Sequence, residues 1–194
     1  MALILSIETA TTVCSVAVHK NGEVLGNQTL FIAHSHSGLL APTIDSLLNY
    51  VGFEPASLDA IAISKGPGSY TGLRIGTSTA KGLCHALDIP LIAVNTLKGM
   101  ALSVAKYVER KKNTLLCPMI DARRMEVYHL LADVELNILE PTQPKIIEES
   151  SFDSLLKDNK IYFFGNGADK CKKVIEHENA KFIDDITPDA TIFG

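Results

Sequence analysis

A glycine-rich segment between an apolar run and a helical pattern is the first candidate for chemistry. Residues 65–76 read KGPGSYTGLRIG, and such a turn before a helix can present backbone N–H groups to an anion. The segment does not fit a P-loop, because no Gly-Lys-Ser/Thr follows at the required spacing, and it does not fit the dinucleotide fingerprint either. The pattern alone therefore does not identify a phosphate site.

Glu8 follows the first apolar run, where actin-like ATPases place an acidic residue that works with Mg²⁺ and a glycine-containing phosphate turn. Residues 8–12 read ETATT, without glycine. Branched side chains keep a phosphate from approaching the backbone closely. We therefore expect no nucleotide in this part of the chain, and no other cofactor.

Other groupings of polar residues do not amount to a catalytic or metal site. His34 and His36 would share one face of a strand, but no third ligand is near in sequence, so a solvated or capping role is favoured over a metal. Ser, His and Asp residues are all present, but the sequence has no GxSxG motif of the kind that holds a nucleophilic serine. The sequence Asp121-Ala122-Arg123-Arg124 ends an apolar run, and it predicts either a salt-bridged turn or a contact surface.

The elements that would position these residues alternate between strands and helices. Apolar runs predict strands at 3–7, 13–19, 23–31, 60–64 and 91–94, and Asn21-Gly22 predicts a hairpin turn. Helical spacing predicts helices over 37–50, 71–86 and 96–110. Three strands followed by helix, strand, helix, strand and helix is the chain order of a ribonuclease-H-like lobe.

The second half starts in the same way. It predicts strands at 115–120, 126–133 and 161–164, with a polar, proline-containing stretch after the second strand. Short helices are expected at 152–156 and 168–177. We therefore predict an α/β chain of two related lobes with mixed sheets flanked by helices. Residues 1–112 form the first lobe, and residues 113–194 form a second, smaller and incomplete lobe.

Composition and charge favour a cytoplasmic protein that does not hold nucleic acid by itself. The chain has 194 residues, and no stretch is long and apolar enough for a membrane span. The four scattered cysteines contain no CxxC pair, which favours a reducing compartment. Residues 1–112 carry 9 Lys and Arg against 7 Asp and Glu, whereas residues 113–194 carry 9 against 15. Neither half has the dense basic face of an RNA-binding module, and Lys170, Lys172 and Lys173 suit a solvated helix face.

A stripe of small residues marks the helix that follows the glycine-rich loop. Gly72, Gly76, Ala80 and Cys84 recur at every fourth position, so another backbone could approach this face closely. The stripe could pack on the lobe's own sheet. Because apolar groups also lie on other faces of this helix, an intermolecular contact is the second interpretation.

Three segments together resemble the TsaB (YeaZ) family of tRNA threonylcarbamoyladenosine biosynthesis. They are residues 7–17 (IETATTVCSVA), the loop 66–76, and residues 120–128 (IDARRMEVY). The similarity of the motifs extends from residue 1 to about Tyr128. After Tyr128 only the general pattern of the sequence resembles the family. Glu8 stands where the family usually has aspartate, and the family would have a further C-terminal helix after residue 194.

The resemblance implies an actin-like ATPase (ribonuclease-H-like) fold and a non-catalytic, dimerisation subunit. In this family TsaD, a glycoprotease-related protein, binds the metal and transfers the threonylcarbamoyl group to the tRNA adenosine next to the anticodon. TsaB pairs with TsaD, the small ATPase TsaE joins them, and TsaB alone tends to form a homodimer through the same helices. tRNA would be contacted only through the complex.

Carried onto this chain, the resemblance predicts a partner interface on the helices 37–50 and 71–86, with a possible secondary contact at Asp121 and Arg123. The expected interface residues are Leu39, Leu40, Ile44, Leu47, Ser69, Tyr70, Thr71, Gly72, Arg74, Gly76, Ala80 and Leu83.

Three alternatives stay open at this point. An actin-like kinase or ATPase would turn over ATP and would depend on Glu8. An M22-type metallopeptidase homologue would hold stoichiometric zinc or iron. A free-standing RNA-binding module would bind tRNA tightly without TsaD.

Overall fold

Two compact units make up the chain, as seen in a computed structural model that describes residues 2–31 and 36–194. The first unit comprises Met1–Thr96 together with Pro188–Gly194, and the second comprises Leu97–Thr187. The boundary differs from the division at 112/113 that the sequence suggested. The reason is the helix that begins at Thr96, whose Leu97, Met100 and Val104 are buried in a core of the second unit.

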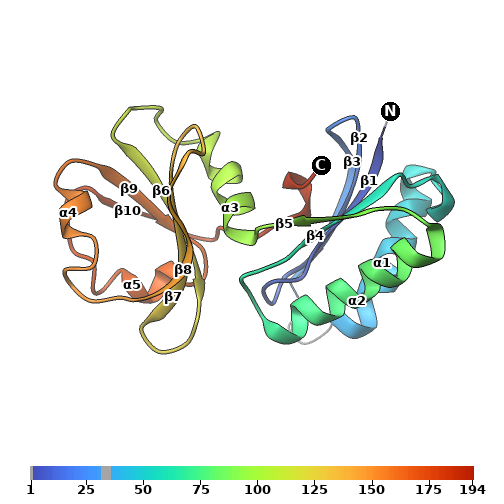
Figure 1. Cartoon of the computed structure of the whole chain (residues 1–194), viewed down its shortest axis with the longest axis horizontal. Helices are drawn as coiled ribbons and strands as arrows, with labels where there is room; N and C mark the ends of the chain where they lie inside the picture. Colours follow the sequence, from blue (N-terminus) through green and yellow to red (C-terminus); the bar gives the residue numbers. More distant parts are fainter. Residues whose placement is uncertain (1, 32–35) are drawn as a thin grey trace. The chain divides into compact units, whose positions relative to one another are not determined.

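The first unit is a five-stranded mixed sheet with two long helices on one face (Figure 1). Its elements are β1 (Leu3–Glu8), β2 (Cys14–Lys20), β3 (Glu23–Leu30), α1 (His36–Val51), the 3-10 turn η1 (Pro55–Ser57), β4 (Ala60–Ser64), α2 (Tyr70–Leu87), β5 (Leu91–Val94) and the 3-10 turn η2 (Ala190–Ile192). The strand order is β3-β2-β1-β4-β5. Strands β1 to β3 are antiparallel, and β4 and β5 run parallel to β1.

The local sequence accounts for the limits of these elements. Asn21 and Gly22 both have positive φ, 55° and 82°, as the tight turn between β2 and β3 requires. Ser69 caps α2 by accepting a hydrogen bond from the Gly72 N–H at 3.2 Å. The helix ends at Asp88, which adopts the left-handed conformation.

Both faces of the first sheet are covered, which explains why β1 and β2 are buried along almost their whole length, including the polar residues Ser6, Ser15 and His19. Helices α1 and α2 cover one face, and η2 packs on β1, β2 and β3. The backbone of this terminal segment is hydrogen-bonded to the sheet: Ala190 N–H donates to Ser15 Oγ at 3.2 Å, and His19 Nε2 lies 3.0 Å from the Thr191 carbonyl oxygen.

The second unit repeats the strand order of the first. Its elements are α3 (Thr96–Ala105), β6 (Thr114–Asp121), β7 (Glu126–Asp133), β8 (Ile138–Ile146), α4 (Asp153–Leu156), β9 (Lys160–Phe164), α5 (Ala168–Cys171) and β10 (Ala180–Ile183). Read from its other edge, the second sheet has the order β8-β7-β6-β9-β10. Strands β6 to β8 are antiparallel, and β9 and β10 run parallel to β6, as in the first sheet. The prediction of an α/β, actin-like fold with two related lobes and mixed sheets is therefore confirmed.

Several predicted elements of the second half are corrected. The polar, proline-containing stretch after the second strand contains edge strand β8, where Pro141 and Pro144 are tolerated because an edge strand leaves N–H positions unpaired. The helix expected over 168–177 ends at Cys171, the helix expected over 96–110 ends at Ala105, and β10 was not predicted. Within the described residues, no helix is long and apolar enough to cross a membrane.

Candidate functional site

The stripe of small residues on α2 faces the unit's own sheet. Gly72, Gly76, Ala80 and Cys84 are all buried. A Cβ on Gly72 would lie 2.2 Å from the Thr9 carbonyl oxygen, and a Cβ on Gly76 would lie 2.3 Å from Thr9 Oγ1. The stripe is therefore small because the chain after β1 passes directly beneath α2, which supports the first of the two interpretations of its sequence.

The glycine-rich loop before α2 is held against the same residues. The Ser69 N–H donates to the Ala10 carbonyl oxygen at 2.6 Å, and a Cβ on Gly68 would lie 2.3 Å from that oxygen. The side chain of Ser69 already accepts from the Gly72 N–H. These contacts fix the first turn of α2, and with it the direction in which Tyr70 points.

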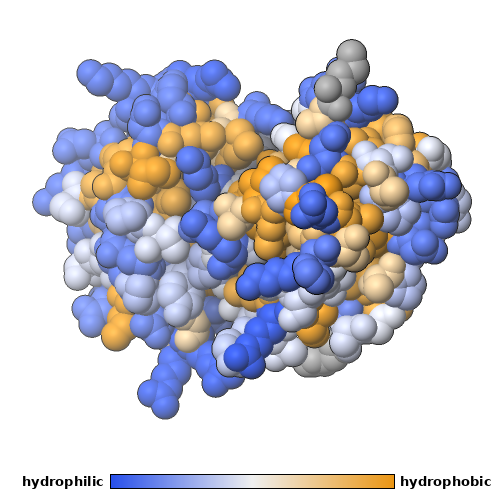
Figure 2. Space-filling view, turned by 45° about the vertical axis from the view of Figure 1, so that its right-hand side comes forward, coloured by the Kyte–Doolittle hydropathy of each residue, from blue (hydrophilic) through white to orange (hydrophobic). Residues whose placement is uncertain are grey.

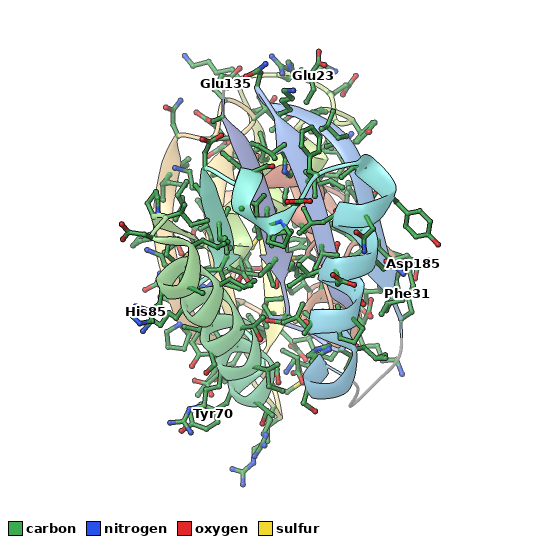
Figure 3. All side chains as sticks on the ribbon, turned by 90° about the vertical axis from the view of Figure 1, so that its right-hand side faces the viewer. Glu23, Phe31, Tyr70, His85, Glu135 and Asp185 are labelled. Atoms are coloured by element: carbon green, nitrogen blue, oxygen red, sulfur yellow. The ribbon has the colours of Figure 1, made fainter. Side chains whose placement is uncertain are left out.

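Tyr70 and Arg74 form an exposed pair on the outer side of α2. The Tyr70 side chain is 70% exposed, and the Arg74 guanidinium lies 4.3 Å from the centroid of its ring, a cation–π arrangement. Figure 3 shows Tyr70 at one end of α2, projecting away from the sheet. Together with Leu73, Thr77, Ser78 and Lys81, the pair lines an open hollow of about 270 Å³.

An apolar groove runs between α1 and α2 on the same side of the unit. It has a volume of about 150 Å³ and is lined mainly by Ala41, Ile44, Leu48, Leu58 and Leu83, with Asp45 at its margin. Figure 2 shows hydrophobic residues gathered on the surface of this unit, interrupted by hydrophilic ones. We call the Tyr70–Arg74 pair and this groove the helical face.

The structure divides the residues predicted for the partner interface into two groups. Half of them lie in the unit's own core and offer little or no surface to another molecule: Leu40, Ile44, Leu47, Gly72, Gly76 and Ala80. The others are exposed or half-buried: Leu39, Ser69, Tyr70, Thr71, Arg74 and Leu83. The partner interface stays a prediction for all twelve residues, and in the described structure only the second group offers exposed or half-buried surface for it.

Glu8 is enclosed at the end of β1. Its Oε1 accepts hydrogen bonds from the Ala10 N–H at 2.5 Å and the Ser64 hydroxyl at 2.8 Å, while Oε2 has no partner among the described residues. Burial raises the pKa of this carboxyl from 4.5 to about 7, against the lowering effect of the hydrogen bonds. Glu8 is therefore enclosed by the backbone at Ala10 and by Ser64 of the same unit.

The histidines singled out in the sequence do not form a metal site in the described structure. His36 is buried at the start of α1, where its Nε2 lies 2.8 Å from the Thr11 carbonyl oxygen. His34 and Ser35 lie outside the described residues. Within the ranges 2–31 and 36–194, no cluster of three or more His, Cys, Asp or Glu side chains could hold a metal ion.

In the second unit, Asp121 is the last residue of β6, and Arg123 lies in the turn between β6 and β7. Lys170 of α5 forms an ion pair with Asp121 and donates to the Glu126 carbonyl oxygen at 2.7 Å. The expectation that Lys170 belongs to a solvated helix face is therefore wrong. No sequence signal indicated its role, because Lys170 and Asp121 are far apart in the chain and are joined only by the fold.

Comparison with known proteins places the chain in a family. The family model described as TsaD, tRNA N6-adenosine threonylcarbamoyltransferase, matches residues 24–190. The tRNA threonylcarbamoyladenosine biosynthesis protein TsaB of Bacillus subtilis is 34% identical over 89% of this chain and 75% of that protein. TsaB of Escherichia coli is 37% identical over 64% of this chain and 52% of that protein.

A solved structure has the same fold. YeaZ from Pseudomonas aeruginosa superposes with a TM-score of 0.80, covering 100% of this chain and 89% of that one at 24% identity. The motifs of the glycine-rich loop, the matched family model and the Bacillus relative agree with one another. The chain belongs to the TsaB (YeaZ) family of tRNA threonylcarbamoyladenosine biosynthesis proteins.

Proposed function

We propose that this protein is a non-catalytic scaffold that binds a TsaD-type threonylcarbamoyltransferase through the helical face and supports the transfer of the threonylcarbamoyl group to tRNA. One observation carries the proposal: Tyr70 and Arg74 stand exposed on a rigid first turn of α2. Tyr and Arg are the residue types that most often dominate binding energy at protein interfaces, and the half-buried Leu39 and Leu83 of the same two helices add apolar area.

The arrangement of polar groups supports a binding role over a catalytic one. Glu8 is buried and hydrogen-bonded within the protein. The thiols of Cys14, Cys84, Cys117 and Cys171 are all buried and have raised pKa values, with desolvation as the main cause, which makes each a poor nucleophile. An exposed aromatic and basic surface therefore suits a partner better than a substrate.

In this account the chain is one member of a cytoplasmic assembly. TsaD is the catalytic subunit, and the ATPase TsaE joins the heterodimer. In the absence of TsaD, the helical face covers the same face of a second copy and gives a homodimer. tRNA is contacted through the assembled complex, because its phosphates require more cations than either half of this chain supplies.

Reconstituted tRNA modification tests the function. TsaD and TsaE from the same organism, with threonylcarbamoyl-adenylate and unmodified tRNA, are expected to form threonylcarbamoyladenosine at a much higher rate when this protein is added. Tyr70→Ala/Arg74→Glu should remove that stimulation. Tyr107→Ala/Arg110→Glu, which changes an exposed Tyr and an exposed Arg of the second unit, should retain it. Equal rates with and without the native protein would refute the proposal.

A further inference from the structure

The tight turn between β2 and β3 carries one of the two Asn-Gly pairs of the chain. The pairs are Asn21-Gly22 and Asn166-Gly167. Asparagine is chemically labile, and most so before glycine, which has no Cβ to keep its backbone nitrogen away from the asparagine side chain. Since both asparagines are followed by glycine, a difference between them in the folded protein has to come from their surroundings.

The reaction open to such a pair is deamidation, which consumes only water. The glycine backbone nitrogen attacks the asparagine Cγ, the bond from Cγ to the side-chain nitrogen breaks, and the proton of the backbone nitrogen leaves with ammonia. Water then opens the resulting succinimide ring. Opening at Cγ gives aspartate, whereas opening at the main-chain carbonyl carbon gives isoaspartate, in which the chain runs through the side-chain carbon.

The fold restrains both reacting groups of Asn166-Gly167. Asn166 Oδ1 accepts from the Asp121 N–H at 3.0 Å, and the Gly167 N–H donates to the Met119 carbonyl oxygen at 3.1 Å. Gly167 is buried, and a Cβ added there would lie 2.8 Å from the Ile120 carbonyl carbon. The attack at this pair therefore requires that both residues first separate from β6.

Asn21-Gly22 has no such restraint. Among the residues that the structure describes, neither the side-chain amide of Asn21 nor the N–H of Gly22 has a hydrogen-bond partner. Both residues are exposed, and a Cβ added at Gly22 would meet nothing within 4 Å. The Asn21 N–H does donate to the Ala2 carbonyl oxygen at 3.1 Å, but this bond leaves the reacting atoms free.

The place of the turn in the sheet allows the backbone to move. Asn21 has a φ of 55°, and ring closure requires it to leave this left-handed conformation. The turn lies at the tip of a hairpin whose last pair is Lys20 with Glu23, and the second strand of the hairpin, β3, is at the edge of the sheet. Such tips open locally at a small cost in free energy.

We propose that Asn21 is a site of spontaneous deamidation, and that the fold confines the reaction to Asn21 by protecting Asn166. The product places a new negative charge at the tip of the hairpin. Isoaspartate also lengthens the backbone of a two-residue turn by one carbon atom, which loosens the end of the hairpin because the turn geometry sets the pairing of its strands.

The inference is independent of the proposed function. Figure 3 shows Glu23, next to the turn, at the opposite end of the first unit from Tyr70. Failure of one account therefore leaves the other standing.

The test compares the two pairs within one molecule. The full chain is kept in mildly alkaline buffer, and samples taken over weeks are cut with a glutamyl endopeptidase, which separates residues 9–23 from residues 150–176. Tandem mass spectrometry measures the replacement of NH₂ by OH at each asparagine, and a methyltransferase specific for isoaspartate labels the second product. Asn21 should convert at least about 30-fold faster than Asn166, which has two more hydrogen bonds to break.

The same chain unfolded in guanidinium chloride is the control, and there the two asparagines should convert at similar rates. Equal rates in the folded protein, or faster conversion of Asn166, would overturn the inference. It would equally be overturned if neither asparagine converts in the folded protein while both convert in denaturant. A preference for Asn21 that persists unchanged in denaturant would also contradict it, because the preference would then come from the sequence and not from the fold.

The loosening of the hairpin has its own control. Asn21→Asp supplies the charge without the additional carbon atom. Hydrogen exchange of the amides at the Lys20–Glu23 end of the hairpin should be faster in the fraction that carries isoaspartate at position 21 than in the native protein or in Asn21→Asp. Equal exchange in all three would overturn this consequence.

Discussion

Glu8 brings an ionisable side chain into a fully buried position of the first unit, and its surroundings determine what it does. Ser64 and the Ala10 N–H satisfy one carboxyl oxygen, whereas the other oxygen has no partner in the described structure. The cost of burying the charged form outweighs the hydrogen bonds, so the pKa rises to about 7. The Glu8 carboxyl therefore titrates near neutral pH, and its protonation affects the stability of the first unit.

The raised pKa of Glu8 predicts a pH-dependent stability. Between pH 4.5 and 7 the folded state keeps a proton that the unfolded chain has lost, so the free energy of unfolding falls as pH rises through this window and levels off above it. The loss attributable to Glu8 is about 3 kcal/mol at most. Urea unfolding of the native protein and of Glu8→Gln is followed from pH 5 to 8. The loss is the change with pH in the difference between their free energies of unfolding.

Glu8→Gln should have the flatter profile and should gain stability relative to the native protein toward pH 8. Glu54→Gln, at an exposed position, serves as the control and should follow the native profile. Parallel pH profiles for the native protein and Glu8→Gln would contradict the buried, protonated carboxyl.

Gly76 tests the packing of α2 on the chain beneath it. A Cβ at Gly76 would lie 2.3 Å from Thr9 Oγ1 and 3.1 Å from Ile63 Cδ1, so Gly76→Ala should destabilise the first unit by about 1 to 3 kcal/mol through overpacking. Gly82 lies in the same helix, and a Cβ added there would meet nothing within 4 Å. Gly82→Ala should instead stabilise by about 0.5 to 1 kcal/mol. Urea unfolding of both variants gives the comparison, and equal effects would contradict this packing.

At the scale of elements, the sequence was informative where a pattern is local. The Asn21-Gly22 turn and the helices expected over 37–50 and 71–86 appear within a residue or two of their predicted bounds. These features depend on turn chemistry and on the period of apolar residues. The order of elements along the chain predicted two related lobes, which the repeated strand order of the two sheets confirms.

The missed features depend on contacts between distant residues. Edge strand β8 carries two prolines and an irregular pattern, so only its pairing with β7 defines it. The stripe on α2 was compatible with a partner or with its own sheet, and the approach of Thr9 decides between them. The turn between β6 and β7 is held by Lys170 of α5, which is distant from it in the sequence.

The segment that carries η2 is a further element whose role only the fold reveals. Ala190 is fully buried, and its N–H donates to Ser15 in β2. Ala190→Glu should destabilise the first unit by about 3 kcal/mol, because it places an unpaired charge against the sheet. Lys181→Glu, at an exposed site of the second unit, should change little. Hydrogen exchange of the amides of β1 to β3 would show the effect, and unchanged protection there would contradict the packing of this segment.

At the scale of the whole molecule, two lobes of one topology carry surfaces of different chemistry. The first lobe presents an exposed aromatic and basic pair on α2, and the second presents Arg123 and Arg124 in a hollow that Glu126, Met125 and Ile146 also line. The chain has a net charge of −4, so neither surface is embedded in a strongly basic field that would attract tRNA. The proposed binding of TsaD concerns the helical face of the first lobe.

The helical face is the central claim, and light scattering coupled to size-exclusion chromatography tests it most directly. The native protein alone should elute as a dimer and should exchange into a heterodimer when TsaD is added. Tyr70→Ala/Arg74→Glu should do neither, whereas Tyr107→Ala/Arg110→Glu should behave as the native protein does. A native protein that stays monomeric and does not bind TsaD, or a Tyr70/Arg74 variant that still forms both species, would contradict the account.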